Sequence, residues 1–420
     1  MINNVISVVG LGYIGLPTAA IFANRKKSVI GLDIDRSIVA TINRGEIHIV
    51  EPDLGLIVRA AVRDGYLRAT TEAESADAFL IAVPTPFGEN KLPDLTFVES
   101  AARSIAPVLK KGDLVVLEST SPVGTTEKLS FWLAEERNDL TFPHQFGEES
   151  DIRIAYCPER VLPGHIVKEL ISNDRVIGGM TPKCAQEAVL LYKTFVEGAC
   201  ITTDVRTAEM CKLTENSFRD VNIAFANELS IICEMQGVNV WELIRLANRH
   251  PRVNILQPGP GVGGHCIAVD PWFIVSANPI EARIIRTARE VNDSKPEWVI
   301  EKIKSALKAV PVNQDNPKDQ PNVACFGLSF KPDIDDLRES PAVSIVQAIS
   351  KFHTGPLWVV EPNINALPTL LSEVATLKNF EYAMENADVI VLLVDHDEFR
   401  SHCYSGDKEK VLIDCKGIWT

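Results

Sequence analysis

Three glycines near the start of the chain constrain its fold most strongly. Gly10-Leu-Gly12-Tyr-Ile-Gly15 follows an apolar run, Val5–Val9, and precedes a segment whose pattern predicts an amphipathic helix through Ala23. Gly10 permits a tight turn, Gly12 lets a pyrophosphate approach the backbone, and Gly15 allows close helix packing. The helix N-terminus adds partial positive charge. The motif predicts a strand–turn–helix unit for a dinucleotide, the alternative being a tight turn that binds nothing.

An acidic residue supports the dinucleotide interpretation. Asp33 ends the next apolar run, Val29–Asp33, 18 residues beyond Gly15. A carboxylate there accepts hydrogen bonds from a ribose diol and repels a 2′-phosphate. The sequence therefore predicts NAD, rather than NADP, as the cofactor.

Apolar runs alternate with helical patterns at both ends of the chain, which is typical of parallel α/β sheets. The first series of expected strands is Val5–Val9, Ser28–Leu32, Ala78–Val83, Leu114–Leu117 and Arg153–Tyr156, and Arg153–Tyr156 is the last strand expected in this unit. The second series is Val323–Phe326, Leu357–Val360, Val389–Val394 and Val411–Asp414. The expected fold class is α/β, with two Rossmann-like parallel-sheet domains.

The middle of the chain differs from both ends. Thr203–Asn248 contains no proline and a single glycine, Gly237, which predicts a long connecting helix followed by shorter ones. The glycine- and proline-rich segment Gln257–Cys266 predicts a loop, and Val310–Asn322 is the expected linker. The predicted domains are residues 1–202, 203–310 and 311–420, of which the middle one is helical.

Composition limits the class of protein. The chain has 420 residues, 46% of them hydrophobic, with a formal charge of −14, which argues against nucleic-acid or anionic-membrane partners. No run approaches the roughly 20 apolar residues of a membrane span, and the N-terminus lacks the basic start of a secretory signal, so a cytoplasmic protein is expected. The nine cysteines show no C-x-x-C pair and are expected to be reduced, mostly core thiols, with no metal site.

Hydroxyl-bearing residues follow two expected strands of the first unit. Thr85 lies in Pro84-Thr-Pro86, and Thr120 and Thr126 lie in the segment after Leu117. Ligands bind beyond the carboxyl ends of parallel strands, so these hydroxyls are candidates to face the cofactor. Ser, Thr, Pro and Gly also make ordinary turns, and that alternative stays open for each.

Cys266 is the candidate nucleophile. It ends the glycine-rich loop, four residues before Asp270, where nothing in the sequence resembles a core. On the long predicted helix, Lys212, Asn216 and Arg219 share one face, a pattern that an ordinary solvated face would also explain. A thiol near such cations would be accessible and favoured as thiolate.

Further charged residues stand in irregular segments. Glu159 and Arg160 are expected at the end of the last strand of the first unit, where the carboxylate could handle protons and the guanidinium could bind a phosphate or a sugar-ring group. The alternative is a surface ion pair. His250 and Arg252 offer two more donors. The strand-to-helix turn 327–340 is suited to a diphosphate, through cations that include Lys331 and Arg338.

These motifs together resemble the UDP-glucose/GDP-mannose dehydrogenase family. The resemblance rests on the glycine fingerprint, Lys212-Leu-Thr-Glu-Asn216, Gly-Gly-His-Cys266 and Phe330-Lys-Pro332, and covers essentially the whole chain. It implies an N-terminal NAD domain, a helical middle domain that dimerises, and a C-terminal UDP domain. It also implies a four-electron oxidation of a nucleotide-sugar alcohol to a carboxylate, with two NAD per sugar.

The resemblance implies roles for individual residues. Cys266 would form a thiohemiacetal and then a thioester, Lys212 and Asn216 would stabilise the oxyanion, and Glu159, Thr120 or Asp270 would handle water and its proton. The implied cofactor-binding residues are Gly10, Gly12, Tyr13, Ile14, Gly15, Asp33, Thr85, Thr126 and Arg338. The implied substrate-binding residues are Arg160, Val161, Lys212, Asn216, Arg219, His250, Arg252, Gly263, Phe330 and Lys331.

The resemblance also bears on the substrate. The segments 248–255 and 266–272 resemble family members that act on UDP-N-acetyl-D-mannosamine, a 2-acetamido sugar. The segment after Cys266 also lacks the lysine that UDP-glucose dehydrogenases typically carry there. The resemblance further implies a link to surface polysaccharides such as enterobacterial common antigen. UDP-glucose and UDP-N-acetylglucosamine remain alternatives, as do a single-step dehydrogenase or epimerase and a non-catalytic sensor of NAD and nucleotide sugar. A homodimer is implied, in which His250, Arg252 or Arg338 would reach the partner's site.

Overall fold

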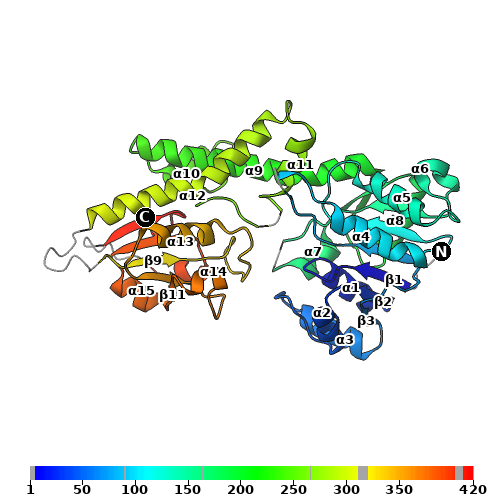
Figure 1. Cartoon of the computed structure of the whole chain (residues 1–420). Coiled ribbons are helices and arrows are strands. Elements are labelled where there is room, and N and C mark those ends of the chain that lie inside the picture. Colours follow the sequence, from blue (N-terminus) through cyan, green and yellow to red (C-terminus); the bar gives the residue numbers. More distant parts are fainter. Residues whose placement is uncertain are drawn as a thin grey trace. The chain divides into compact units, whose positions relative to one another are not determined.

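The computed structural model describes residues 5–88, 91–162, 164–264, 266–310, 320–402 and 410–419. The chain divides into two compact units. Unit 1 comprises Met1–Glu215 with Trp272–Ala277, and unit 2 comprises Asn216–Pro271 with Asn278–Thr420. Each unit contains one sheet (Figure 1). The three domain boundaries expected from the sequence stay a prediction.

Unit 1 is built on an eight-stranded sheet with the order β3-β2-β1-β4-β5-β6-β7-β8. Its strands are β1 (Val5–Val9), β2 (Ser28–Leu32), β3 (Leu67–Thr70), β4 (Ala78–Ile81), β5 (Leu114–Leu117), β6 (Arg153–Tyr156), β7 (Arg175–Gly179) and β8 (Cys200–Asp204). Its helices are α1 (Gly15–Asn24), α2 (Arg36–Asn43), α3 (Leu54–Arg63), α4 (Thr96–Ile105), α5 (Thr125–Glu136), α6 (Pro143–Phe146), α7 (Ile166–Ser172) and α8 (Pro182–Tyr192), with 3₁₀ turns η2 (Ala106–Val108) and η3 (Gly147–Glu149).

The sequence located the central strands of unit 1 and missed three others. β3, β7 and β8 are not among the expected strands, so the expectation that Arg153–Tyr156 is the last strand of this unit was wrong. These strands are as long as the predicted ones, but none has the apolar run that marks a strand buried on both faces: β3 contains Arg68, β7 contains Arg175 and two glycines, and β8 lies at the edge with mostly exposed residues. β7 pairs with β6 in the antiparallel direction, so the sheet is not wholly parallel. Glu159 and Arg160 therefore follow an interior strand.

The core of unit 1 covers both faces of its sheet. Along β4, Ala78 and Leu80 enter one apolar cluster, whereas Phe79 and Ile81 enter the other. This alternation follows from the two-residue period of a strand. The strand order reverses at β1, which has β2 on one side and β4 on the other, and ligands of such sheets bind at this point.

Helix α1 corrects one expectation. It was predicted to be amphipathic, but every residue of it from Gly15 to Ala23 is buried. Its apolar side chains belong to the same cluster as residues of α3 and α7, so neighbours enclose it on several sides. A helix covered all round needs no polar face.

Unit 2 contains a five-stranded parallel sheet with the order β11-β10-β9-β12-β13. Its strands are β9 (Val323–Phe326), β10 (Leu357–Val360), β11 (Thr376–Leu377), β12 (Val389–Leu392) and β13 (Val411–Asp414). Its helices are α10 (Val240–Ala247), α12 (Arg283–Ala309), α13 (Pro341–Phe352), α14 (Thr369–Ser372), α15 (Phe380–Asn386) and α16 (Asp397–Arg400). The predicted parallel sheet is confirmed, and only the short edge strand β11 was missed.

Two helices include residues of both units. α9 (Val205–Met235) is the long helix that the sequence predicts, and α11 (Asp270–Ala277) follows the glycine-rich loop. Asp204 starts α9 by accepting hydrogen bonds from the backbone and hydroxyl of Thr207. The helix ends just before Gly237, whose φ is +68°.

The loop and linker expectations have different outcomes. No helix or strand occurs among the described residues between 251 and 264, which confirms the glycine-rich loop. Most of the expected linker, residues 311–319, lies outside the described residues. In the part of the chain that the structure describes, no helix is both long and apolar enough to cross a membrane.

Candidate active site

The glycine fingerprint has the geometry that its sequence predicts. Gly10 adopts φ +88°, and a Cβ on Gly15 would lie 1.8 Å from the Gly10 carbonyl oxygen, so neither position tolerates a side chain. A Cβ on Gly12 would meet no atom within 4 Å. The backbone is therefore tightly packed at Gly10 and Gly15 and accessible at Gly12, which is the arrangement that a pyrophosphate-binding turn requires. Tyr13 and Ile14 complete the turn into α1, and these residues fit NAD.

Asp33, directly after β2, is tied to this turn. Its Oδ2 accepts a hydrogen bond of 2.8 Å from the backbone N–H of Leu11, and its Oδ1 accepts one of 2.9 Å from Asp35. The predicted ribose-binding carboxylate is thus held beside the fingerprint.

The threonines expected near the cofactor differ in their surroundings. The hydroxyl of Thr85 donates to the carbonyl of Thr120 at 2.5 Å, which joins the ends of β4 and β5. Thr126 is fully buried and its hydroxyl donates to Glu209 of α9 at 2.6 Å. Glu209 also accepts the N–H groups of Gly124 and Thr126 at the start of α5. Glu209, which sequence reasoning missed, is a buried carboxylate that caps this helix.

Glu159 forms a buried ion pair, not the surface pair considered as the alternative. Its Oε2 lies 3.0 Å from Nη2 of Arg175, its Oε1 accepts the N–H of Arg160 at 2.7 Å, and the residue is 8% exposed. Arg160 pairs with Glu215 of α9 at 2.7 Å. Arg175 lies on β7, a strand that the sequence did not reveal, so its pairing with Glu159 could not be foreseen.

A second buried carboxylate lies near this pair. Burial raises the pKa of Glu118 to about 7, with Glu159 adding to the rise and Arg175 opposing it. Its Oε1 accepts a 2.6 Å hydrogen bond from the hydroxyl of Tyr192. Unit 1 therefore holds two buried acidic side chains, Glu118 and Glu159, near one arginine, and burial there favours the neutral form of Glu118.

The charged stripe of α9 is more than a solvated face. Lys212 is half-buried, Asn216 is buried and Arg219 is exposed. Asn216 Nδ2 donates to the buried carboxylate of Asp270, at the start of α11. Two residues predicted to be catalytic, 54 positions apart in the chain, are thus in direct contact within unit 2.

A buried polar network that the sequence analysis missed supports the glycine-rich loop. Arg289 of α12 pairs with Asp220 at 2.6 Å, and Asn292 donates to the same oxygen at 2.8 Å. Asn227 bonds both Asn292, at 2.8 Å, and the N–H of Gly259, at 2.9 Å. A signal was available, since Asn216, Asp220 and Asn227 share one face of a helix.

Cys266 has the exposure expected of a nucleophile. Among the eight cysteines described, Cys266 is exposed, five are buried and two are partly buried, while Cys403 lies outside the described residues. Its carbonyl accepts the N–H of Asp270 at 2.9 Å and leads the chain into α11. The preceding residue, His265, lies outside the described residues.

The loop before Cys266 packs on the segment after β9. A Cβ on Gly264 would lie 2.7 Å from the ring of Phe330, and one on Gly263 would lie 2.8 Å from Cβ of the same residue. Gly264 also donates its N–H to the carbonyl of Arg338 at 3.2 Å. Gly263, Phe330 and Arg338, predicted separately as ligand-binding residues, are therefore neighbours within unit 2.

The other predicted binding residues lie in several segments, and Lys331 lies next to Phe330. His250 and Arg252 are exposed after α10, with Nδ1 of His250 accepting the N–H of Arg252 at 3.3 Å. Lys331 is half-buried in the segment after β9, and Arg338 pairs with Asp336 at 2.6 Å. Val161 packs against the core of unit 1.

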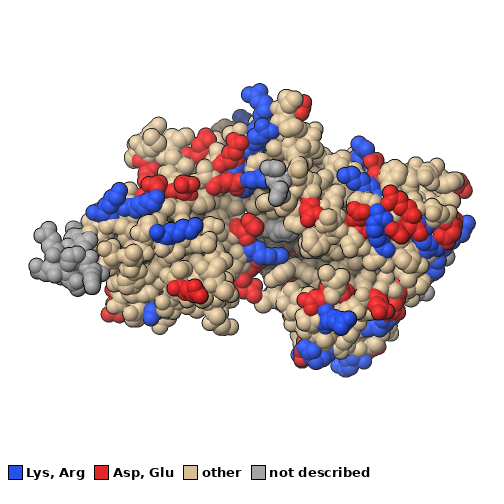
Figure 2. All heavy atoms as spheres, in the orientation of Figure 1, with Lys and Arg blue, Asp and Glu red and all other residues tan. Residues whose placement is uncertain are grey.

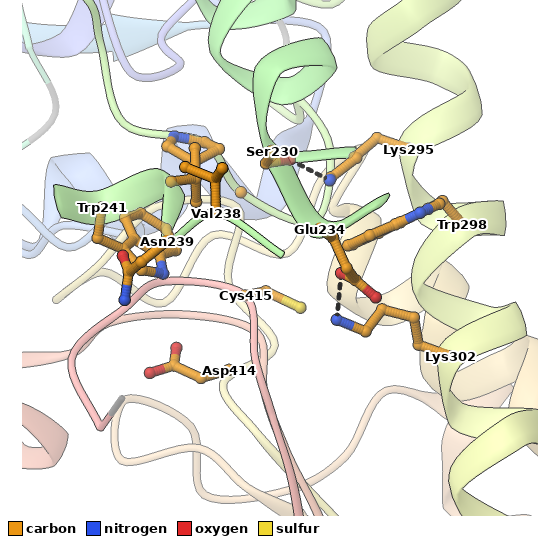
Figure 3. Close-up of a pocket in the computed structure, with 13 residues that line it drawn as sticks. Ser230, Glu234, Val238, Asn239, Trp241, Lys295, Trp298, Lys302, Asp414 and Cys415 are labelled. Atoms are coloured by element: carbon orange, nitrogen blue, oxygen red, sulfur yellow. Dashed lines mark hydrogen bonds and ion pairs between the residues drawn. The ribbon is translucent and has the colours of Figure 1, made fainter. Parts of the chain in front are cut away.

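Unit 2 also has a cavity of about 270 Å³ whose walls come from α9, α10, α12 and the end of β13 (Figure 3). Lys295 points into a polar part of it and donates to Oγ of Ser230 at 2.6 Å. Its Nζ also lies 3.6 Å from the ring centroid of Trp298. Burial lowers the pKa of Lys295 to about 8. Pro258 and Gly259 of the glycine-rich loop form part of the same wall.

Charge is mixed on the visible surface. Figure 2 shows Lys and Arg interspersed with Asp and Glu, with no extended field of one sign on this face. Among the described residues, no group of three His, Cys, Asp or Glu side chains is arranged to hold a metal ion.

Three family models match the chain in order. They describe the NAD binding domain, central domain and UDP binding domain of the UDP-glucose/GDP-mannose dehydrogenase family, at residues 4–196, 206–294 and 324–420. The last of these contains the described segment that carries Phe330 and Lys331. The first model, of the NAD binding domain, contains the glycine fingerprint, so the cofactor of this chain is NAD.

Known relatives cover nearly the whole chain. UDP-N-acetyl-D-mannosamine dehydrogenase from Escherichia coli K12 is 65% identical over 416 residues, 99% of each chain. NDP-N-acetyl-D-galactosaminuronic acid dehydrogenase from Ralstonia nicotianae is 66% identical over 415 residues, 99% of this chain and 96% of the relative. The solved UDP-D-ManNAc dehydrogenase from Pyrococcus horikoshii is 37% identical, with a TM-score of 0.87 over 99% of this chain and 96% of that one. The chain belongs to the UDP-glucose/GDP-mannose dehydrogenase family.

Proposed function

We propose that this chain oxidises UDP-N-acetyl-D-mannosamine to UDP-N-acetyl-D-mannosaminuronate and reduces two NAD for each sugar. The observation that carries the proposal is the exposed thiol of Cys266, on a glycine-rich loop packed against the UDP binding domain of a family of NAD-dependent dehydrogenases. Relatives of that name are about two-thirds identical over nearly the full length, which supports the choice of sugar.

The proposed chemistry proceeds in two oxidations. When bound, NAD supplies the hydride acceptor for each of them. The C6 alcohol first becomes an aldehyde, and the Cys266 thiolate adds to the aldehyde carbon to give a thiohemiacetal. Loss of the second hydride leaves a thioester, which water cleaves to the carboxylate and the free thiolate. Covalent capture keeps the aldehyde bound while the reduced cofactor is exchanged.

Lys212 and Asn216 are proposed to stabilise the oxyanion that develops on C6. The amide of Asn216 has two N–H bonds and donates one to Asp270, which fixes its orientation and leaves the other for substrate. Glu159, Thr120 and Asp270 remain the candidates to position water and move its proton. Both oxygens of Glu159 already accept hydrogen bonds from protein N–H groups, which fix the position of its side chain.

For each ligand, the proposed contacts include residues from both ends of the chain. NAD would bind at the fingerprint turn, Asp33, Thr85 and Thr126, with Arg338 also proposed. The nucleotide sugar would be bound by Arg160, Val161, Arg219, His250, Arg252, Gly263, Phe330 and Lys331. The boundaries 1–202, 203–310 and 311–420 are proposed as the limits of three domains.

A second candidate substrate is a nucleotide sugar with the galacto configuration. It is favoured by the Ralstonia nicotianae relative, whose identity of 66% equals that of the mannosamine enzymes within one per cent. UDP-glucose and UDP-N-acetylglucosamine are the further alternatives. All would use the same cysteine chemistry.

We also propose a homodimer, located in the cytoplasm. Phe218, Phe225 and Ile232 repeat every seven or so residues on α9 and are 68%, 52% and 41% exposed. An apolar stripe on one helical face is typical of a surface that another chain covers. A second copy is the occupant we propose, since the expected family dimer forms through this middle region.

The experiment is a product assay with the purified full-length chain. NADH and uronate are measured after incubation with NAD and, separately, UDP-N-acetylmannosamine, UDP-N-acetylgalactosamine, UDP-N-acetylglucosamine and UDP-glucose. The proposal requires two NADH and one uronate per molecule of the mannosamine substrate, with the highest kcat/KM. One NADH per sugar would instead indicate a single-step dehydrogenase, and binding without NADH a sensor.

A further inference from the structure

The second sheet has its own point of strand-order reversal. β9 lies in the middle of the sheet. The chain continues from β9 to β10 and β11 on one side, and then crosses to β12 and β13 on the other side. Ligands of open parallel sheets bind beyond the carboxyl ends of strands at this point. Three segments meet there: residues 327–333 follow β9, Glu361 follows β10, and His396 lies shortly after β12.

Hydrogen bonds to the side chain of Glu361 link these three segments. Its Oε2 accepts the N–H groups of Leu328 and Ser329, at 2.7 and 3.1 Å, while its Oε1 accepts the N–H of Asn363 at 3.1 Å. Its Oε2 also lies 3.0 Å from Nε2 of His396. Burial alone would raise the pKa of Glu361, but the hydrogen bonds from His396 and the backbone outweigh burial and hold the pKa below its usual value. Each of these partners donates, so the group is a carboxylate.

The hydrogen bonds determine the tautomer of His396. The backbone N–H of Asp333 donates to Nδ1 at 2.9 Å, and a backbone N–H can only donate. Nδ1 is therefore the acceptor, and the ring proton lies on Nε2, where it is donated to Glu361. His396 is 0% exposed. Asp333 has φ +60°, a strained conformation that these contacts offset.

The segment held in this way is in contact with the nucleophile's loop. It carries Phe330, whose ring leaves no room for a Cβ at Gly264. Gly264 is two residues before Cys266. A chain of direct contacts thus runs from the buried Glu361–His396 pair, through residues 328–333, to the loop of Cys266.

We propose that His396 and Glu361 are positioning residues, which hold residues 328–333 in the shape that binds UDP and through Phe330 hold the loop of Cys266. The roles of Phe330 and Cys266 in this inference rest on the proposed function. The pair itself touches neither substrate nor cofactor in the proposal. It sets the shape of the UDP-binding segment and, with it, the position of the thiol.

The test uses the full-length protein with two variants, Glu361→Gln and His396→Asn. Glu361→Gln keeps the side-chain volume but places an NH₂ group opposite the N–H donors that Glu361 accepts. His396→Asn has a shorter side chain, whose NH₂ group does not reach the position of Nε2 and so leaves Glu361 without this donor. The measurements are the Kd of UDP by calorimetry, the Kd of NAD, the KM for the nucleotide sugar, and the alkylation rate of Cys266 by iodoacetamide, read from its peptide. We expect UDP to bind about tenfold more weakly in each variant. Alkylation of Cys266 should be at least about threefold faster, because the loop loses packing, with the Kd of NAD unchanged.

Asp388→Asn is the matched control. Asp388 precedes β12 at the amino ends of the strands, where it accepts the N–H of Asn322 at 2.6 Å. It should lower the melting temperature and leave UDP binding and alkylation unchanged. The inference is overturned if the two variants only lose stability, as the control does. If Glu361→Gln fails to fold, His396→Asn decides the matter alone. UDP binding needs no turnover, so a wild-type chain that binds UDP and oxidises no sugar refutes the proposed function separately.

Discussion

The side-chain amide of Asn216 donates a hydrogen bond to the carboxylate of Asp270, and both side chains are buried. The family resemblance implies different tasks for these residues: oxyanion stabilisation for Asn216, and water handling for Asp270, with Glu159 and Thr120 as the alternatives to Asp270. Their contact means that a change in one alters the other.

Replacing Asn216 by Asp should therefore impair more than one step. The new carboxylate would face Asp270 and repel the developing oxyanion, so kcat should fall about a hundredfold, the usual cost of losing one oxyanion donor. Steady-state NADH formation measures the effect. Asn222→Asp on the same helix is the control, because the Asn222 amide donates to the helix carbonyl of Phe218. Equal activity of the two variants would contradict the assigned role.

Cys266→Ser should abolish uronate formation, with a loss of at least about a hundredfold, since an alcohol is a far poorer nucleophile than a thiolate. The Kd values of UDP and NAD should stay as in the wild type. Cys211→Ser is the control, a partly buried thiol on α9. Normal turnover in Cys266→Ser would remove the covalent mechanism.

Asp33→Asn should weaken the preference for NAD. The carboxylate that accepts the Leu11 N–H is also the one expected to repel a 2′-phosphate. The kcat/KM ratio of NAD to NADP should fall about tenfold. Asp35→Asn is the control, because Asp35 is exposed and caps α2 through Ser37. An unchanged ratio would show that discrimination lies elsewhere.

Glu118→Gln should stabilise the protein at alkaline pH. The folded pKa of Glu118, about 7, is above its ordinary value of 4.5, so the folded state retains a proton that the unfolded state has released. This difference lowers the free energy of unfolding. The loss is absent below pH 4.5, grows as the pH rises from 4.5 to 7, and reaches about 3 kcal/mol above pH 7.

Thermal unfolding at pH 5 and pH 8 measures this effect. The melting temperature of Glu118→Gln should exceed that of the wild type at pH 8, and the difference should shrink toward pH 5. Glu127→Gln is the control, since the hydrogen bond from Arg206 lowers the pKa of Glu127, so that its effect on the melting temperature should be the same at pH 5 and pH 8 and change only at lower pH. A pH-independent difference would argue against a buried, protonated Glu118.

Phe225→Ser should dissociate the proposed dimer. The exposed stripe on α9 would lose its central aromatic ring, and light scattering after size exclusion should report about half the mass at micromolar concentration. Leu190→Ser is the control, an exposed apolar residue on α8 of unit 1, 63% exposed. A wild-type chain that is already monomeric would exclude the dimer.

Some features of this protein were determined by the sequence alone. The sequence predicted the turn at the fingerprint glycines and the position of Asp33, because the backbone freedom of glycine is a local property. It also predicted the strands that are buried on both faces, because each of them is a short apolar run. These strands are β1, β2, β4, β5, β9, β10, β12 and β13. The exposure of Cys266 was predicted for a related reason, since a glycine-rich segment has few side chains with which to form a core.

The tertiary structure decided what depends on distant partners. β7 and β8 lack an apolar run, and only their pairing makes them strands. The Glu159–Arg175 pair, the Asn216–Asp270 contact and the tautomer of His396 join residues 16, 54 and 35 or more positions from their partners. No periodicity along the chain encodes such contacts, because burial and the geometry of donors and acceptors arise only when the sheets are assembled.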